Sequence, residues 1–304
     1  MQDTNVKIIK KRKTRKKFSV LYLILGLFLA LYALSMLFVL FWALSTSFKD
    51  PILDFEMNYV GVPKSLHYQN YLTVIRQFFV KVKTVDGGNR NVLFPEMLLN
   101  SVLFAVGNAL VQVTVTFIVA YAASRFKFFI GKVIYAIVIV GMILPIVGSQ
   151  PSALAVSRQL GLYDSILGMY VHKFTFLGMY FLVFHATLGS FPKDYEEAAE
   201  IDGASNLSVM LRIMWPLSIT TYCTVLLLVF IAQWNDYTTP MLFMPNVPTI
   251  AYGLRSFDNS SNNEITNVPT RMAACLLGAI PTLTLFIIFH DRLLNNISLG
   301  GVKE

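Results

Sequence analysis

The stretch Asp194–Pro216, DYEEAAEIDGASNLSVMLRIMWP, decides the fold of this chain because it is a polar segment between two long apolar runs. Its first part predicts a short helix, in which Asp194 caps the N-terminus and Glu197, three residues later, reaches back to the cap. Gly203 is expected to take the left-handed backbone conformation that closes such a helix. The first half of the segment therefore predicts a helix that ends in a glycine turn.

The second half of the segment predicts a second helix. Either Ser205 or Asn206 has a side chain that can cap its N-terminus. We expect this helix to run to Trp215, after which Pro216 begins the next membrane span. A solvated loop between two membrane helices is the alternative to this helix–glycine–helix unit.

The composition indicates a membrane protein. Of the 304 residues, 55% are hydrophobic and 14% are charged, and the mean hydropathy of +0.59 is too high for an ordinary soluble domain. The net charge of +8 raises the alternative of a nucleic-acid-binding arm. The basic block precedes the first apolar run, however, where it acts as a topology signal beside the lipid bilayer, and we expect no binding to nucleic acid. Its members are Lys7, Lys10, Lys11, Arg12, Lys13, Arg15, Lys16 and Lys17.

The N-terminal part of the chain divides into three segments. Residues 1–18 form a basic cytoplasmic N-terminus and residues 19–44 the first transmembrane helix. A cleaved signal peptide is the alternative, but an apolar run of about 26 residues is too long and lacks a small-residue cleavage site. Residues 45–96 are expected to lie outside the cytoplasm, with a turn at Asp86 to Asn89.

The remaining apolar runs predict an all-α, polytopic helix bundle with six transmembrane helices in total. These runs lie near Met97–Ser124, Lys132–Val156, Ile166–Leu188, Leu217–Phe243 and Met272–Leu294. An even number of spans places both termini in the cytoplasm. Arg125, Lys127 and Lys132, at the turn after the second span, agree with that orientation, because basic residues concentrate in cytoplasmic loops. Residues 97–294 then form a core with a cytoplasmic loop at 190–216, and residues 295–304 a cytoplasmic tail.

The polar segment contains a characteristic spacing of residues. It begins with Glu197, Ala198 and Ala199; Gly203 follows after three intervening residues, Ile213 after nine more and Pro216 after two more. It resembles the EAA signature of the membrane subunits of bacterial ABC importers, and the longer EAAEIDGAS resembles the carbohydrate-uptake branch, the maltose-permease type. Trp215 stands where that family usually has leucine. The resemblance implies the type I ABC importer permease fold and a loop whose helices dock on a cytoplasmic ATPase. The residues it implies for ATPase coupling are Glu197, Ala198, Ala199, Asp202, Gly203, Ala204, Ile213 and Pro216.

Small side chains in this loop have a physical role in such docking. Ala198, Ala199 and Ala204 would let a helix seat closely in a groove, and acidic side chains at the rim would fix its orientation. The C-terminal LGGVKE also resembles the family, whose GGVKG-like terminus contacts the ATPase dimer, although Glu304 replaces the last glycine. The implied tail contacts are Gly300, Gly301, Val302 and Lys303.

Polar side chains within two of the apolar runs are candidates for lining a path through the membrane. In the fourth run, Lys173 is expected to share a helical face with Tyr170 and Tyr180. A lysine that snorkels to the outer interface, or a structural ion pair, is the alternative. In the third run, a kink between Pro145 and Pro151 would expose Gln150.

The fifth run ends in AQWNDYTTPMLF, which resembles the WNxxxxP segment of carbohydrate permeases. Pro240 is expected to break the helix at membrane depth and to expose polar groups beside it. An interfacial aromatic belt is the alternative explanation for Trp234 and Tyr237. The other candidates for the path in this segment are Gln233, Asn235 and Asp236, which stands where the family often has glutamate.

No catalytic or metal-binding pattern is evident in the sequence, so we expect no enzyme and no bound cofactor. There is no Walker A motif, and the lone GK at Gly131 and Lys132 lacks its preceding glycine. Cys223 and Cys275 both lie in apolar runs and are expected to be small core residues rather than a disulfide. ATP and Mg²⁺ would be used by partner ATPase subunits.

Together these features predict one half of the translocation pore of an ATP-driven, binding-protein-dependent importer of a sugar or oligosaccharide in a bacterial cytoplasmic (inner) membrane. The resemblance implies three partners: a second homologous permease, a dimer of cytoplasmic ABC ATPase subunits and an extracytoplasmic solute-binding protein. A permease for a non-carbohydrate solute is one alternative. An ion-coupled secondary carrier is the other, but it should show paired charges within its spans, and Lys173 has no evident acidic partner in the sequence.

Overall fold

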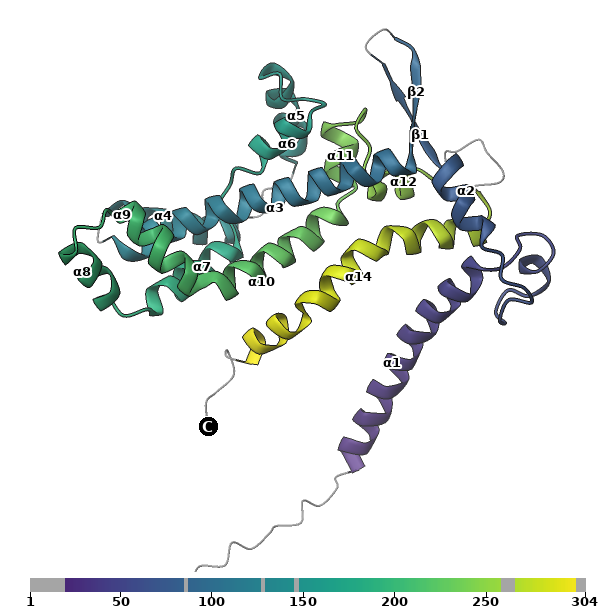
Figure 1. Cartoon of the computed structure of the whole chain (residues 1–304), viewed down its shortest axis with the longest axis horizontal. Helices are drawn as coiled ribbons and strands as arrows, with labels where there is room; N and C mark the ends of the chain where they lie inside the picture. The colour runs from purple at the N-terminus through teal and green to yellow at the C-terminus, as the bar shows by residue number, and fades with distance from the viewer. Residues whose placement is uncertain (1–19, 85–86, 127–128, 145–147, 258–265, 299–304) are drawn as a thin grey trace, which may run out of the picture.

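The structure, a computed structural model, describes residues 20–84, 87–126, 129–144, 148–257 and 266–298, with side chains up to residue 289 (Figure 1). These parts of the chain are predominantly helical, as the sequence predicts. The prediction of an all-α chain is wrong in one place, because residues 79–93 form a two-stranded β-hairpin.

The first helix, α1 (Val20–Ser47), follows the predicted first span and extends three residues beyond it. Its apolar side chains are exposed along almost its whole length, and only Ser45, Thr46 and Ser47 at its end are buried. There the amide of Asn70 donates to the carbonyl oxygen of Ser47 at 2.8 Å. As Figure 1 shows, α1 therefore joins the rest of the molecule at one end, beside α2 (Gln69–Gln77).

The hairpin consists of β1 (Phe79–Lys83) and β2 (Asn89–Leu93), which pair antiparallel with Phe79 opposite Leu93 and Lys83 opposite Asn89. Val80 and Val82 of β1 are buried while Lys81 and Lys83 are exposed, the alternation typical of a half-buried strand. Gly87 belongs to the turn that the sequence predicts at Asp86 to Asn89, and it has a φ of 78°.

The core lies among α3 (Phe94–Arg125), α7 (Met179–Ser190) and α10 (Trp215–Trp234), with α14 (Val268–Ser298) alongside. Phe117 is at the centre of this core. Its ring packs edge-on against the rings of Phe184 and Tyr222, with centroid distances of 5.4 Å and 5.8 Å. Side chains from three helices are thus fixed against one another, which gives this part of the bundle a single packing arrangement.

Three of the predicted spans are interrupted. The third run forms α4 (Phe129–Ile143) and α5 (Gln150–Gln159), and the fourth forms α6 (Ile166–His172) and α7. The fifth forms α10 and α11 (Thr238–Phe243), and α12 (Ile250–Arg255) follows. Glycines with positive φ mark the first two breaks, Gly148 at 81° and Gly178 at 142°.

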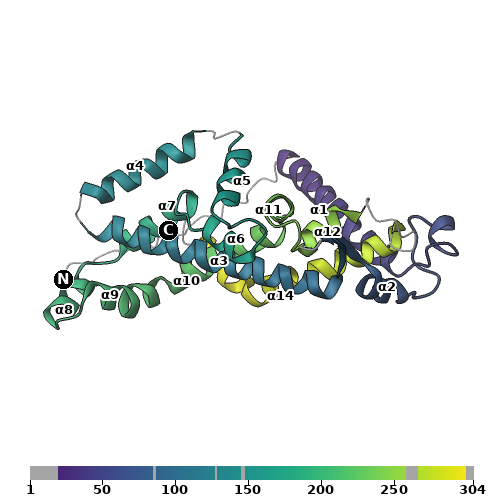
Figure 2. The same ribbon diagram turned by 90° about the horizontal axis from the view of Figure 1, so that it is seen from above.

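Seen from above, α4 stands to one side of the α3–α10 pair (Figure 2). It approaches α3 at Gly131, because a Cβ there would lie 3.0 Å from the carbonyl oxygen of Ala123. Of its residues only Gly131 and Val138 are buried. The remainder of α4 exposes apolar side chains, as α1 does.

Three helices in the described parts of the chain are long and apolar enough to cross a membrane: α1, α3 and α14. A fourth is added if the bent pair Asn206–Leu217 and Ile219–Trp234 counts as one span. The six continuous spans expected from the sequence are therefore not all found as single helices. The reason is that hydropathy detects the apolar runs but not the breaks within them.

Candidate functional site

The acidic helix α8 (Asp194–Ile201) lies at the end of the bundle opposite the hairpin (Figure 1). Asp194, Glu196 and Glu197 are in its first turn, where negative charge interacts favourably with the helix dipole. The predicted capping box is wrong, however. Asp194 is the first helical residue, the position before it is Lys193, and no side chain caps the N-terminus.

Gly203 closes α8 as the sequence predicts, with a φ of 79°. The N–H of Ala204 donates to the carbonyl oxygen of Ala199 at 2.9 Å, and the N–H of Gly203 donates to that of Glu200 at 3.0 Å. This pair of bonds is the Schellman arrangement, which satisfies the last carbonyls of a helix and favours glycine at the left-handed position. The turn after α8 is thus fixed by its own backbone.

The second helix of the unit begins at Ser205, whose hydroxyl accepts a hydrogen bond from the N–H of Ser208 at 3.4 Å. The prediction of a cap at this position is confirmed. The predicted extent is also confirmed to within two residues, because the helical segment that starts with α9 (Asn206–Val209) runs to Leu217 before the chain bends. α9 continues through a π-helical segment, Met210–Met214, directly into α10.

A bend of 78° separates Asn206–Leu217 from Ile219–Trp234. Pro216 stands at the start of α10 and offers no N–H to the preceding turn. The hydroxyl of Ser218 donates to the carbonyl oxygen of Met214 at 2.7 Å, a bond of a type that bends helices. The bend thus has two local causes next to a π-helical segment, itself a common site of kinks.

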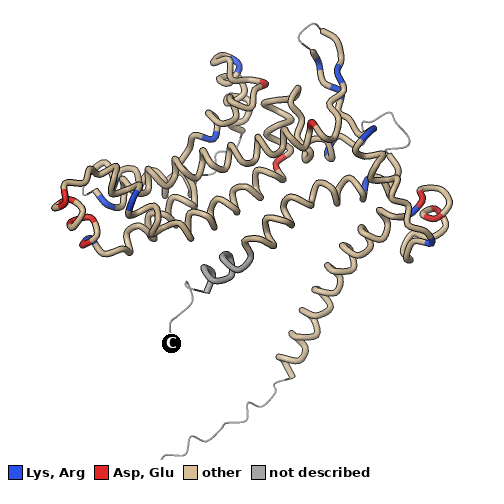
Figure 3. The backbone as a smooth tube through the Cα atoms, viewed as in Figure 1, with Lys and Arg blue, Asp and Glu red and all other residues tan. Residues whose placement is uncertain are grey.

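The predicted coupling residues divide by exposure. Ala199 is only 8% exposed because it packs into the core of this chain, so it is not available to a partner, and the predicted alanine surface is smaller than expected. Ala204 and Ile213 are half-buried against the same core. The exposed members are Glu197, Ala198, Asp202, Gly203 and Pro216. Figure 3 shows that the acidic residues of this unit lie together along the backbone at the tip of the molecule.

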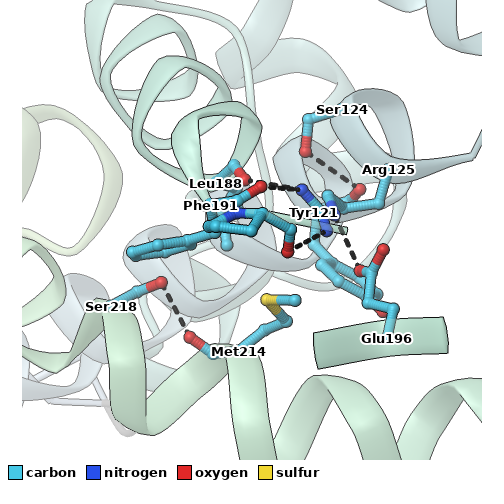
Figure 4. A network of polar contacts seen from close by, with 9 residues as sticks. Tyr121, Ser124, Arg125, Leu188, Phe191, Glu196, Met214 and Ser218 are labelled. Atoms are coloured by element: carbon cyan, nitrogen blue, oxygen red, sulfur yellow. Dashed lines mark hydrogen bonds and ion pairs between the residues drawn. The ribbon is translucent and has the colours of Figure 1, made fainter. Parts of the chain in front are cut away.

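A buried arginine joins this unit to the bundle (Figure 4). The Nε–H of Arg125, at the end of α3, donates to Oε1 of Glu196 at 2.7 Å. The same guanidinium donates to the carbonyl oxygens of Leu188 at 3.2 Å, Phe191 at 2.9 Å and Pro192 at 3.4 Å. The arginine side chain is 3% exposed and that of Glu196 15% exposed. This ion pair is therefore well shielded from water.

Sequence reasoning used Arg125 only as a topology signal and did not place Glu196 in the site. The two residues are 71 positions apart. The available signal was the basic residue itself, since an arginine at the edge of an apolar helix needs a partner when it is buried. Sequence alone could not identify that partner among five acidic residues of the segment, Asp194, Glu196, Glu197, Glu200 and Asp202.

The predicted shared face of Tyr170, Lys173 and Tyr180 is wrong. α6 ends at His172, and the chain leaves the helix before α7 begins at Met179, so Tyr180 lies on another helix. Tyr170 donates its hydroxyl to the carbonyl oxygen of Leu103 at 2.8 Å. Lys173, half-buried in the break, interacts electrostatically with Asp236. The sequence missed this acidic neighbour.

In the fifth run the break precedes Pro240. α10 ends at Trp234, and Pro240 lies within α11, buried. Trp234 is 5% exposed and donates its indole N–H to the carbonyl oxygen of Gly278 at 3.0 Å, and together with Asn235 it lines a cavity between α10, α12 and α14. Tyr237 is 42% exposed, and the guanidinium carbon of Arg255 lies over its ring, 5.9 Å from the ring centroid.

The other polar candidates of this run differ in their surroundings. Gln233 is buried, and its Nε2 donates to Oε1 of Gln112 at 3.5 Å. Asn235 is exposed, and its side-chain amide donates to the carbonyl oxygen of Ile231 at 2.8 Å. Asp236 accepts a hydrogen bond from the N–H of Thr239 at 3.0 Å. These three side chains therefore do not share one surface.

One buried polar group was not predicted. Asn108 on α3 is fully buried, and among the described residues neither of its amide atoms has a hydrogen-bond partner. Gln112, one helical turn along α3, bonds to Gln233. Two side-chain amides on one face of α3 thus point into the bundle, which is unusual enough to mark a polar interior.

The remaining predictions concern the edges of the described chain. Gln150 is exposed at the first turn of α5, as the predicted kink requires, while Pro145 lies outside the described residues. The tail residues Gly300, Gly301, Val302 and Lys303 also lie outside them, as does the basic N-terminus. Cys223 and Cys275 are both free, as predicted, although Cys275 is exposed rather than in the core.

Comparison with known proteins gives a consistent result. A family model described as "Binding-protein-dependent transport system inner membrane component" matches residues 91–298. The chain is 27% identical to a probable ABC transporter permease protein, YurM, of Bacillus subtilis, over 96% of this chain and 92% of that protein. It is 27% identical to the trehalose/maltose transport system permease protein MalG of Thermococcus litoralis, over 90% of this chain and 94% of that protein.

Two further matches extend the comparison. The sn-glycerol-3-phosphate transport system permease protein UgpE of Pectobacterium atrosepticum is 29% identical over 67% of this chain and 72% of that protein. Among solved structures, a bacterial ABC transporter involved in the import of the acidic polysaccharide alginate matches with a TM-score of 0.73 at 20% identity, covering 90% of this chain and 96% of that one. The structural match concerns the fold alone.

Proposed function

This chain belongs to the family of inner membrane components of binding-protein-dependent transport systems, and from that premise we propose that it forms one half of the pore of a sugar or oligosaccharide importer. As a permease subunit of an ABC transporter it is not itself an enzyme. ATP and Mg²⁺ are used by a dimer of cytoplasmic ATPase subunits. A second homologous permease completes the pore, and an extracytoplasmic solute-binding protein delivers the solute.

The observation that carries this proposal is the exposed α8–Gly203–α9 unit. The EAA residues Glu197 and Ala198 are exposed on it, and Gly203 fixes the angle between its helices. A short helix with a small-residue face, held by a rigid turn, is suited to receive a docked partner and to transmit its rigid-body movement. We assign ATPase coupling to the exposed residues, with Ala199, Ala204 and Ile213 supporting them from within.

The membrane arrangement follows from this docking. The coupling unit must face the cytoplasm, which puts the hairpin outside. Six crossings result if each interrupted run crosses as a pair of helices: α1, α3, α4–α5, α6–α7, α10–α11 and α14. Both termini then lie in the cytoplasm of a bacterial cell, beside its cytoplasmic membrane. We assign contact with the ATPase dimer to the tail residues Gly300, Gly301, Val302 and Lys303 from the resemblance of their sequence alone.

The carbohydrate assignment rests on the EAAEIDGAS segment and on relatives named for trehalose, maltose and sn-glycerol-3-phosphate transport. For the solute path we retain Gln150, Tyr170, Lys173, Tyr180, Gln233, Asn235, Asp236 and Tyr237, and we add Asn108 and Gln112. Trp234 is retained with them, because it lines a cavity together with Asn235. Hydroxyl-rich solutes suit a lining of amides and tyrosines, since these groups both donate and accept hydrogen bonds.

The test of the coupling role is co-purification of the chain with its candidate ATPase from membranes. We expect wild type to retain the ATPase, and Gly203→Pro and Glu197→Lys to lose it or its coupled hydrolysis while still inserting. Gly161→Pro is a matched control, because Gly161 also has a positive φ, 68°, and also donates to a carbonyl three residues earlier. Glu56→Lys is the control for charge reversal at an exposed site. Failure of wild type to bind any ATPase would refute the proposal.

The solute class needs its own measurement. In the reconstituted complex with its binding protein, ATP hydrolysis should rise on addition of maltose, trehalose or a longer oligosaccharide. A dipeptide and a free amino acid serve as probes for the non-carbohydrate alternative. If the dipeptide or the amino acid stimulated ATP hydrolysis and no sugar did, the importer assignment would stand and the carbohydrate assignment would be overturned.

A further inference from the structure

The guanidinium of Arg125 connects three parts of the molecule that meet at the cytoplasmic end of the proposed topology. It belongs to the last turn of α3, its Nη1 and Nη2 donate to carbonyl oxygens just beyond α7, and its Nε donates to Glu196 in α8. All four hydrogen bonds come from one planar, rigid group (Figure 4). Packing already fixes α3 against α7, and this one side chain connects α8 to both of them.

The bonds of this group are of a strong kind. The Arg125–Glu196 pair is charge-assisted and shielded from water, and the carbonyls of Leu188 and Phe191 are at the negative end of α7, where a cation interacts favourably with the helix dipole. A buried arginine with four acceptors has little freedom to rotate. Removing its carboxylate partner leaves a buried charge that is only partly compensated.

The other end of the coupling unit is connected in a contrasting way. From α9 the chain enters a π-helical segment and then bends by 78° before Ile219. Pro216 lacks the N–H that would strengthen this turn. Among the described residues, no ion pair crosses the bend. The coupling unit is thus held to α3 and α7 by hydrogen bonds, whereas it connects to α10 through a bend.

We propose that Arg125 is a positioning residue that makes α8 a rigid extension of α3 and α7. A displacement of α8 by its docked partner then moves α3 and α7 directly, and the bend before Ile219 takes up the difference on the α10 side. Glu196 is the acceptor that completes this joint. The inference rests on the proposed function in one respect, namely that α8 is the element that the ATPase moves.

The rigidity of the joint is measurable by distances between spin labels in the complete transporter in lipid nanodiscs. One label replaces Leu99 on α3, which is 59% exposed, and the other replaces Glu200 on α8, which is also exposed. Cys223→Ser and Cys275→Ser remove the native thiols. The 26 positions from Leu99 to Arg125 span roughly 39 Å of helix, a range suited to pulsed electron spin resonance.

We expect the distance distribution of the otherwise unmodified chain to be narrow and to shift by less than about 2 Å between nucleotide-free and ATP–vanadate-trapped complexes, as in rigid-body motion. Glu196→Ala should broaden the distribution and let it shift with nucleotide. Glu196→Gln keeps an oxygen acceptor for the Nε–H and should restore the narrow distribution. Ser124→Ala is the control, because that neighbouring hydroxyl donates only within α3, to Tyr121.

Two outcomes would contradict the proposed rigid connection between α8 and α3. The first is a nucleotide-dependent shift of more than about 5 Å in the unmodified chain, because a shift of that size is a relative motion of packed elements. The second is a narrow, unshifted distance distribution in Glu196→Ala. Loss of the ATPase from Glu196→Ala would also overturn this connection, since Glu196 would then be a docking residue. If the unmodified chain itself binds no ATPase, the proposed function has failed. The nucleotide-free comparison of Glu196→Ala with Glu196→Gln still tests the joint in that case.

Discussion

The side-chain amide of Asn246 donates to Oδ2 of Asp164 at 2.7 Å, although the two residues are 82 positions apart. The backbone N–H of Asn246 also donates to Oδ1 of Asp164 at 2.9 Å, and Oδ1 of Asn246 accepts from the N–H of Lys83 in β1 at 2.9 Å. Three segments that are distant in the sequence are therefore held together by one asparagine. An isolated two-stranded hairpin is marginally stable in water, so this attachment should govern its order.

Asn246→Ala should loosen the hairpin. It removes the bonds to Lys83 and to Oδ2 of Asp164, which together contribute about 1–2 kcal/mol to local stability. Amide hydrogen exchange across residues 79–93 should become about 5- to 30-fold faster. Asn91→Ala, an exposed change on β2, should leave the exchange of β1 nearly unaltered. Equal effects of the two substitutions would show that Asn246 does not hold the hairpin.

Gly107→Ala should displace Tyr170. A Cβ at position 107 would collide with the ring of Tyr170, whose hydroxyl is bonded to Leu103 on the same helix. Overpacking of this kind costs about 1–3 kcal/mol, so the midpoint of thermal unfolding in detergent should fall by several degrees.

The double variant Gly107→Ala with Tyr170→Ala isolates the cause of that loss. Because the ring is absent, adding the methyl group to the Tyr170→Ala chain should cost about 0.5 kcal/mol or less. If Gly107→Ala costs the same with and without the tyrosine, the close contact between α3 and α6 does not exist.

Asn108→Leu should stabilise the bundle and impair transport. The two side chains have the same branching and number of non-hydrogen atoms, and the substitution removes an amide that is buried without a partner, a defect that costs about 1–3 kcal/mol. The unfolding midpoint should rise while solute-stimulated ATP hydrolysis falls. Ala109→Ser, next to it on α3, is a control that adds a polar group instead and should lower the midpoint. A lower midpoint for Asn108→Leu would show that the amide is satisfied in the assembled protein.

Asp50 makes the turn after α1 sensitive to acid. Its carboxylate accepts from the N–H groups of Leu53 at 2.8 Å and Ile52 at 2.9 Å, and His67 lies 3.5 Å away. The N–H of Leu53 is the main cause that lowers the pKa of Asp50 below its usual value, followed by that of Ile52 and by the charge of His67, against the opposing effect of burial.

Since the folded pKa of Asp50 is lower than the unfolded one, the carboxylate stabilises this turn above the ordinary aspartate pKa of about 3.9. The contribution is lost as the pH falls through the folded pKa. Amide exchange at residues 52–54 should therefore increase in excess of its intrinsic pH dependence below about pH 4. Asp50→Ala, which removes the acceptor of both bonds, should show fast exchange at every pH. A wild-type profile without this excess would contradict the assignment.

Local chemistry made the coupling unit predictable, whereas long-range pairing did not. The turn at Gly203 and the cap at Ser205 depend on residues within four positions, and both were predicted correctly. Arg125 and Glu196 meet because α3 and α8 pack at the same end of the bundle, which no spacing in the sequence reveals. The capping box failed for a smaller reason: the helix begins one residue earlier than its motif indicates.

The interrupted spans show a second limit of the sequence. Hydropathy measures apolar content but does not separate one long helix from two short ones, so Tyr170 and Tyr180 were placed on one face. Gly178 was the available sign of a break. The hairpin was missed although the alternation in FVKVK and the glycines that follow it are typical of one, because the segment was treated only as a connection between membrane spans.

The exposed length of α1 has a consequence for how the protein is made. Chains emerge N-terminus first, so α1 reaches the bilayer before any residue of the core has been synthesised. Because α1 packs on the core only at its end, its insertion does not depend on that core. Once α1 has left the ribosome, it can therefore anchor the chain in the membrane while the core is still being synthesised. Assembly of the remaining helices would then proceed within reach of a fixed point in the membrane.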